Sequence, residues 1–459
     1  MLRWLLGFIL LLAVIAGATF WVAGRGAPPQ ITIEKPDRVV GQTGNVDVLV
    51  EAPGARLTSL IVTLEQNGHT TPLFALGGQS ATVTQVDRDH VRISRPVGKQ
   101  AVPELQQGTA RISVTATRPT FLNLRTLSSA ATKDFRVQLD PPRVAVVSTH
   151  HYINHGGAEM VVYRATPPDV ASGVRVGDIE YPGFPASGAG VGGADPSLKV
   201  AFFGLLYDQD VTTRVMAFAR DEAGNQATAS FIDNAFEKPF KKSNIELDDK
   251  FLGRVVPEII EHTPELKMPV PTGDMMPGFL RLNGELRRQN ADQIAAFAAK
   301  TSPSMLWKEP FFQLGNSKVE ASFADHRTYR YKGQEVDQQV HLGFDLAVTA
   351  RVPVVAANDG IVMNASWLGI YGNCVVIDHG MGVQSLYGHL TSFDVKVGDK
   401  VTRGQTIGRS GATGLAGGDH LHFTMLVGGR MVNPVEWWDP HWVQDRVARK
   451  LAEAGGGSR

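Results

Sequence analysis

The 459-residue chain has a single cysteine, Cys374, and no excess of charge of either sign. One cysteine excludes a disulfide framework and any metal site built from several cysteines of one chain. The 45 Lys and Arg residues balance 45 Asp and Glu residues. Because no basic surplus is available to neutralise phosphates, we expect no nucleic-acid partner. Any metal must therefore be bound by histidine and carboxylate side chains, and Cys374, in an apolar run, is predicted to be a buried side chain.

Charge is also absent from a long stretch near the start of the chain. Residues 4–23, WLLGFILLLAVIAGATFWVA, have the length that spans the hydrocarbon core of a bilayer. The alternative is a cleaved signal peptide with the small residues 16–18 as its cleavage site. The apolar run continues past that site, which favours an uncleaved signal anchor over residues 1–25. We therefore predict a single-pass protein of the inner or cytoplasmic membrane, with its bulk in the periplasm or cell exterior.

Short strand-like stretches with period-two alternation follow the anchor. Two segments begin with Pro-Pro and a β-branched run, at residues 28–33 and 141–146. Alternation with regular turns predicts two antiparallel β-sandwiches, residues 28–139 and 140–235. The end of the second, a DEAGN turn and the strand ATASF, resembles the ending of bacterial immunoglobulin-like (Ig-like) modules.

The pattern changes after residue 235. Phe279, Leu282, Leu286 and Ile294 lie at helical spacing, which predicts a helical connector over residues 236–304. Strands and tight glycine turns return over residues 305–438, a predicted antiparallel β-sheet domain. A C-terminal helix and tail are expected over residues 439–459, so the predicted fold class is mostly β.

Four histidines and one aspartate stand out in the last domain. His341 and Asp345 lie in HLGFD, His389 in YGHL, and His420 and His422 in HLHF. Residues i and i+2 of a strand project from one face, so the last two can share one cleft. Three imidazole or carboxylate ligands with a fourth position open are typical of catalytic zinc. Spacing alone leaves open which histidines bind the metal.

The motifs HLGFDLA, YGHL and GDHLHF, in this order, resemble those of the LytM/lysostaphin-type zinc metallopeptidases. The resemblance covers roughly residues 305–438. It implies that His341, Asp345 and His422 bind Zn²⁺ and that His389 and His420 are catalytic histidines that do not bind it. It also implies hydrolysis of peptide crosslinks between the stem peptides of cell-wall peptidoglycan, with DD-endopeptidase action favoured.

Two other functions compete with this one. A catalytically inactive LytM-like regulator that activates a cell-wall amidase is the main alternative, but such regulators typically lack one or more metal ligands. A purely structural wall-binding module explains the sandwiches and leaves the His/Asp set without a role. In the enzyme hypothesis the Ig-like modules are spacers or docking sites for envelope proteins.

Several weaker signals lie around these motifs. A tyrosine upstream of the first ligand often stabilises the transition state in this family, and Tyr329 and Tyr331 are candidates. The run HHYINH, residues 150–155, is predicted to be a solvated loop rather than a metal cluster. His379 is predicted to be structural, and residues 411–418 to form a flexible wall of the cleft.

Overall fold

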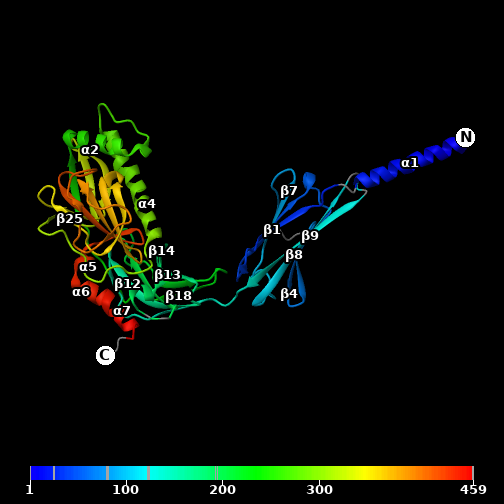
Figure 1. Cartoon of the computed structure of the whole chain (residues 1–459), viewed down its shortest axis with the longest axis horizontal. Coiled ribbons are helices and arrows are strands. Elements are labelled where there is room, and N and C mark those ends of the chain that lie inside the picture. The colour runs from blue at the N-terminus through cyan, green and yellow to red at the C-terminus, as the bar shows by residue number, and fades with distance from the viewer. Residues whose placement is uncertain are drawn as a thin grey trace. The chain divides into compact units, whose positions relative to one another are not determined.

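The structure, a computed structural model, describes residues 2–23, 26–78, 82–120, 123, 125–191, 193 and 195–456. It is mostly β with an N-terminal apolar helix and several antiparallel sheets (Figure 1), which confirms the predicted fold class. The chain divides into two compact units. The first is residues 1–142 with 220–226, and the second is residues 143–219 with 227–459.

Helix α1, Leu2–Ala23, contains the apolar stretch. Its segment Trp4–Val22 has a mean hydropathy of 2.5 and none of it is buried. The helix is long and apolar enough to cross a membrane, as an anchor or a signal sequence would be.

Two sheets contribute to the core of the first unit. The four-stranded sheet has the order β1-β3-β7-β6: Gln30–Lys35, Asn45–Glu51, His90–Pro96 and Thr82–Gln85. The five-stranded sheet has the order β2-β9-β8-β4-β5: Val39–Val40, Thr126–Val137, Gly108–Pro119, Ser59–Gln66 and His69–Ala75. Alternate residues of β3 (Val46, Val48 and Val50) are buried in one core with Leu60 and Ile112 of the other sheet. This is the period-two burial that the sequence predicted.

The second unit begins with three smaller sheets. One has the order β10-β12-β16-β15: Arg143–Val146, Ala158–Thr166, Leu198–Gly204 and Phe184–Pro185. Another has the order β14-β13-β17-β18: Ile179–Pro182, Ala171–Val176, Val215–Arg220 and Gln226–Ser230. The third pairs β11 with β19 in parallel: Tyr152–Asn154 and Asn234–Phe236.

Residues 236–304 are not wholly helical, which corrects the predicted connector. They contain strand β20, Lys242–Leu247, which pairs in parallel with β22, Asp325–Tyr331. The segment KSNIEL alternates polar and apolar residues, a strand pattern that the helical prediction overlooked. The helical elements that follow are α2 (Asp249–His262), α3 (Met276–Arg281), a π-helical turn η5 (Leu282–Leu286) and α4 (Arg287–Phe297).

The largest sheet carries the histidine motifs. Its order is β21-β24-β32-β28-β27-β26-β30, all antiparallel: Lys318–Ala321, Phe344–Ala347, His420–Val427, Val383–Leu390, Asn373–Gly380, Gly360–Trp367 and Lys400–Val401. Strand β33, Arg430–Val432, pairs with β32 in antiparallel orientation. Segments between these strands form a small antiparallel sheet with the order β25-β31-β29: Pro353–Val355, Thr406–Arg409 and Ser392–Phe393. Strand β23, Gln334–His341, pairs with β22 and leads into β24.

Both faces of this sheet are buried. Cys374 and Val376 pack with the apolar faces of α2, α3 and α4, and Cys374 is fully buried, as predicted. Val375 and Ile377, which alternate with them along β27, belong to the core on the other side. Burial on both faces holds the strands rigidly in register.

One core joins the second predicted sandwich to the sheet with the histidine motifs. Phe202 of β16 packs against Trp307 and Trp437, with ring centroids 6.2 Å and 6.0 Å away. The C-terminal helices complete this core: α5 (Val435–Trp438), α6 (Pro440–Trp442), the π-helical turn η8 (Val443–Ala448) and α7 (Arg449–Ala454). The second predicted sandwich and the last domain therefore fold as parts of one unit.

Candidate metal centre

Strand register brings the distant motifs together. Asp345 of β24 lies directly opposite His422 of β32, so their side chains share a face. His341 ends β23, and the turn through Gly343 carries the chain into β24. A Cβ at Gly343 would lie 2.5 Å from His422 Cε1, so only glycine allows this approach.

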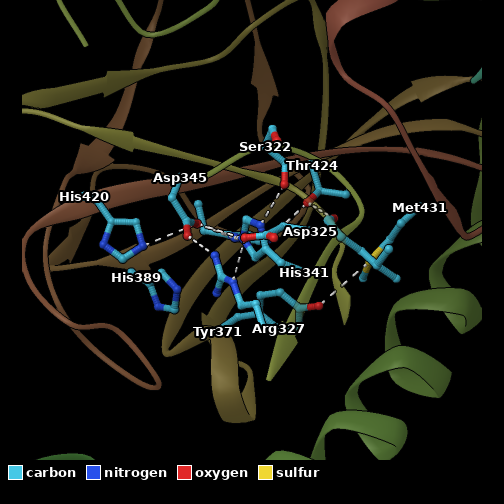
Figure 2. Close-up of polar contacts among 12 residues, drawn as sticks. Ser322, Asp325, Arg327, His341, Asp345, Tyr371, His389, His420, Thr424 and Met431 are labelled. Carbon is cyan, nitrogen blue, oxygen red and sulfur yellow. Dashed lines mark hydrogen bonds and ion pairs between the residues drawn. The ribbon is translucent and has the colours of Figure 1, made fainter. Parts of the chain in front are cut away.

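Three side-chain atoms converge at the centre (Figure 2). His341 Nε2 lies 2.9 Å from Asp345 Oδ1 and 3.1 Å from His422 Nδ1, which is itself 3.0 Å from Asp345 Oδ1. Ligand atoms around a tetrahedral zinc ion, each about 2.0–2.1 Å from it, are about 3.3 Å apart. Among the described residues, these three form a group that can hold a metal ion.

Hydrogen bonds on the far sides of the rings leave the converging nitrogens free. His341 Nδ1 lies 3.2 Å from the Ser322 carbonyl, so it carries the proton and Nε2 keeps its lone pair. Thr424 Oγ1 donates to the Leu342 carbonyl and therefore accepts from His422 Nε2, which leaves His422 Nδ1 unprotonated. Metal-binding histidines in proteins are held in this manner. The donor set fits a metal ion.

The second oxygen of Asp345 is held by an arginine. Arg327 Nη2 lies 3.0 Å from Asp345 Oδ2, and Arg327 Nε lies 3.5 Å from Asp325. Burial alone would raise the pKa of Asp345, but its contacts with His341, His420 and His422 outweigh burial and hold that pKa well below its usual range. Asp345 therefore presents a charged oxygen to the centre.

His389 and His420 lie beside this group with opposite tendencies. Their ring centroids are 4.8 Å apart. His389 Nδ1 donates to the Thr413 carbonyl, and burial lowers the pKa of its ring well below the usual value. Burial acts in the same direction on His420, but its contact with Asp345, 3.5 Å from Nε2, raises its pKa. One ring thus favours the neutral form and the other the charged form, the division expected of an acid and a base.

The backbone of His389 is also unusual. Its φ of 62° lies in the left-handed region, where a residue with a side chain is uncommon. Such strain is found at functional sites, where the surrounding structure enforces it.

A cavity of about 100 Å³ contains these groups. Tyr329 lines it, whereas the Tyr331 hydroxyl bonds Asp249 of α2, so the structure favours Tyr329 of the two predicted candidates. Leu415 and Gly417 of the predicted wall, residues 411–418, line the cavity, but the sequence predictions missed four other lining residues: Arg287, Arg327, Ile370 and Tyr371. Tyr371 is buried, which raises its pKa to about 12, and its ring lies 5.4 Å from that of His422.

The other histidines do not join the centre. The solvated-loop prediction for residues 150–155 is wrong for His151, which is 2% exposed and packs edge-on against Phe231. His379 is fully buried, with one ring nitrogen 2.7 Å from the Asp359 carbonyl and the other 2.7 Å from Ser385 Oγ. Both of its nitrogens are occupied, so its role is structural, as predicted.

The same region matches a known protein family. Residues 339–434 match peptidase family M23, and this range contains all five predicted site residues. The chain is 44% identical over 96 residues to the peptidoglycan DD-endopeptidase ShyA of Vibrio cholerae, covering 21% of this chain and 22% of that protein. It is 41% identical over 97 residues to the DD-carboxypeptidase/endopeptidase Mpg of Neisseria meningitidis, covering 21% and 22%.

A third relative is not named as a peptidase. The chain is 38% identical over 109 residues to the murein hydrolase activator EnvC of Escherichia coli, covering 24% of this chain and 26% of that protein. The chain thus spans about a quarter or less of the length of these curated relatives.

Proposed function

We propose that this chain, whose residues 339–434 match peptidase family M23, is a zinc-dependent endopeptidase that hydrolyses peptide crosslinks of cell-wall peptidoglycan. The observation that carries the proposal is the convergence of His341 Nε2, Asp345 Oδ1 and His422 Nδ1. DD-endopeptidase action is favoured, in line with the names of two relatives.

Each ring has a distinct task in this mechanism. His341, Asp345 and His422 hold the zinc ion, which when bound supplies Lewis-acid activation of water and of the scissile carbonyl. His389 keeps its Nδ1 proton on the Thr413 carbonyl and accepts the proton of the attacking water at Nε2. His420 holds its Nδ1 proton on the Gly418 carbonyl, and its raised pKa suits Nε2 to donate to the developing oxyanion or the leaving amine.

The alternative is an inactive regulator that activates a cell-wall amidase. The similarity to EnvC supports it. The complete ligand set, with both ring tautomers fixed for metal binding, favours the enzyme.

We propose that the rest of the chain anchors the peptidase domain at the membrane and holds it at a distance from it. Helix α1 would anchor it in the inner membrane, with the bulk in the periplasm or cell exterior. The β-sheets of residues 28–139 and 140–235 would act as Ig-like spacers or bind envelope proteins.

The test is release of crosslink fragments from purified peptidoglycan by the full chain in detergent. We expect release that stops with a chelator, returns with zinc, and falls on the order of 10³-fold in His341→Ala, since a metal ion supplies several kcal/mol of transition-state stabilisation. His441→Ala is the matched control, because this side chain is 94% exposed.

Two results would count against the proposal. Release that persists with chelator and in His341→Ala contradicts the zinc mechanism. No release, together with stimulation of an added amidase, supports the regulator.

A further inference from the structure

A cation from outside the family match lines the metal centre. Arg287 is the first residue of α4, in the helical connector, and it borders the same cavity as His341, Asp345 and His422. Since it precedes the matched range of residues 339–434, the match does not account for it.

The local helix geometry fixes this side chain. The Arg287 backbone N–H contacts the Gly284 and Leu282 carbonyls rather than that of Asn283 between them, and the contact with Leu282 has the wider spacing of a π-helical turn. The Asn283 carbonyl instead accepts from Arg287 Nε at 3.1 Å, and Asn283 Oδ1 accepts from Nη2 at 2.5 Å. Asn283 is fully buried and its amide is held by Asp337 Oδ2 at 2.8 Å. The guanidinium is therefore anchored along its Nε–Nη2 edge.

The edge formed by Nη1 and the second hydrogen of Nη2 is available. Nη1 has no hydrogen-bond partner among the described residues, and Arg287 forms no ion pair with any of them. A guanidinium edge with two nitrogens matches the two oxygens of a carboxylate.

The neighbouring arginine differs in this respect. Arg327 lies within ion-pair distance of Asp325 and Asp345, so its charge is already matched. Among the described residues that line the cavity, Arg287 is thus an arginine with no carboxylate partner. Its charge is close enough to Tyr371 to oppose the rise that burial produces in that pKa. Apolar Ile370 and Leu415 also line the cavity, and such walls strengthen attraction for an anion.

We propose that Arg287 binds a carboxylate of the substrate peptide next to the scissile bond. The substrate class is then a crosslinked peptide with a free carboxylate at this position rather than an amide. This rests on the proposed peptidase function. A cavity of about 100 Å³ admits a small planar anion, since a water molecule occupies about 30 Å³.

The test uses two crosslinked stem peptides that differ only in one group beside the scissile bond, a carboxylate or a carboxamide. An N-methylated scissile amide keeps both intact while their binding to the zinc-loaded full chain is measured by fluorescence anisotropy. We expect the carboxylate peptide to bind about tenfold more tightly, the effect of one charged hydrogen-bonded pair.

Variants assign that preference to one residue. Arg287→Gln should abolish it, Arg287→Lys should keep part of it, and Arg288→Gln, at the exposed neighbouring position, should keep all of it. Equal binding of the two peptides by the natural chain, or a preference that survives in Arg287→Gln, would overturn the inference.

The same peptides without the N-methyl group separate this inference from the enzyme function. A binding preference that depends on Arg287 without cleavage supports the carboxylate site and contradicts the peptidase. Cleavage of both peptides with equal KM overturns the carboxylate site and leaves the peptidase standing.

Discussion

The second unit buries histidines and carboxylates in two places, and their surroundings differ. At the metal centre, Asp345 Oδ1 faces the bare nitrogens of His341 and His422. In a second group, which we call the Glu159 cluster (Glu159, His151, Glu436, Arg446 and Lys450), the Lys450 ammonium lies 2.8 Å from Glu159 and both side chains are fully buried. Burial, followed by the charge of Lys450, lowers the pKa of His151 to about 3.

The difference lies in what surrounds the same residue types, and it separates a group that can hold a metal ion from a structural ion pair. In the Glu159 cluster a protein cation already neutralises the carboxylate, and the ring of His151 bonds Ser148. At the metal centre Arg327 takes one oxygen of Asp345, and the other faces ring nitrogens whose protons point away. Convergent lone pairs with no cation between them distinguish a site for a metal from a structural ion pair.

The largest stability effect should come from removing the internal cation of the Glu159 cluster. Lys450→Met removes the cation closest to the buried Glu159 and leaves the more distant Arg446, 3.8 Å away, which should lower the free energy of unfolding by about 3 kcal/mol. Urea unfolding measures this. Arg449→Met, at a half-exposed neighbour, should cost about 1 kcal/mol or less, and neither variant should change zinc affinity. A cost for Lys450→Met as small as that of its neighbour would remove the contrast between the two sites.

The next largest effect is on how the free energy of unfolding depends on pH. Burial raises the pKa of Glu436 from 4.5 to about 7. A carboxyl whose pKa is raised by folding stabilises the fold below its unfolded pKa and loses that contribution as pH rises through 7. The unfolding free energy of the natural chain should therefore fall, relative to Glu436→Gln, by up to about 3 kcal/mol between pH 4.5 and pH 8. Parallel stability curves for the two proteins would refute this.

The smallest effect should come from removing the arginine that holds Asp345. Arg327→Gln frees the second oxygen of Asp345, and loss of such a supporting contact weakens metal binding by about 10- to 100-fold. Competition with a chromogenic chelator measures zinc affinity directly. Arg330→Gln, on the same strand but paired with Glu246, is the control. Unchanged affinity in Arg327→Gln would mean that Asp345 needs no such support.

The i, i+2 rule could place His420 and His422 on one face, but the choice of His341, Asp345 and His422 as ligands came from the family resemblance and stays a prediction. The same rule applied to β22 would have placed Asp325, Arg327 and Tyr329 on one face, and Arg327 could have been found. Arg287 could not, because its position depends on packing between the connector helices and a sheet far along the chain. Strand β20 was missed because a six-residue alternating segment was read with the helical pattern that follows it.

The packing of Phe202 against Trp307 and Trp437 has a consequence for how this chain can be cut or recombined. A fragment that begins where the family match begins, at residue 339, would leave Trp437 without Phe202, Trp307 and Phe311 and would expose a face of the sheet that is now buried. The matched segment, residues 339–434, therefore does not contain the whole of its own core. Residues 143–219 and 227–456 therefore form one compact unit, although the family match occupies only residues 339–434.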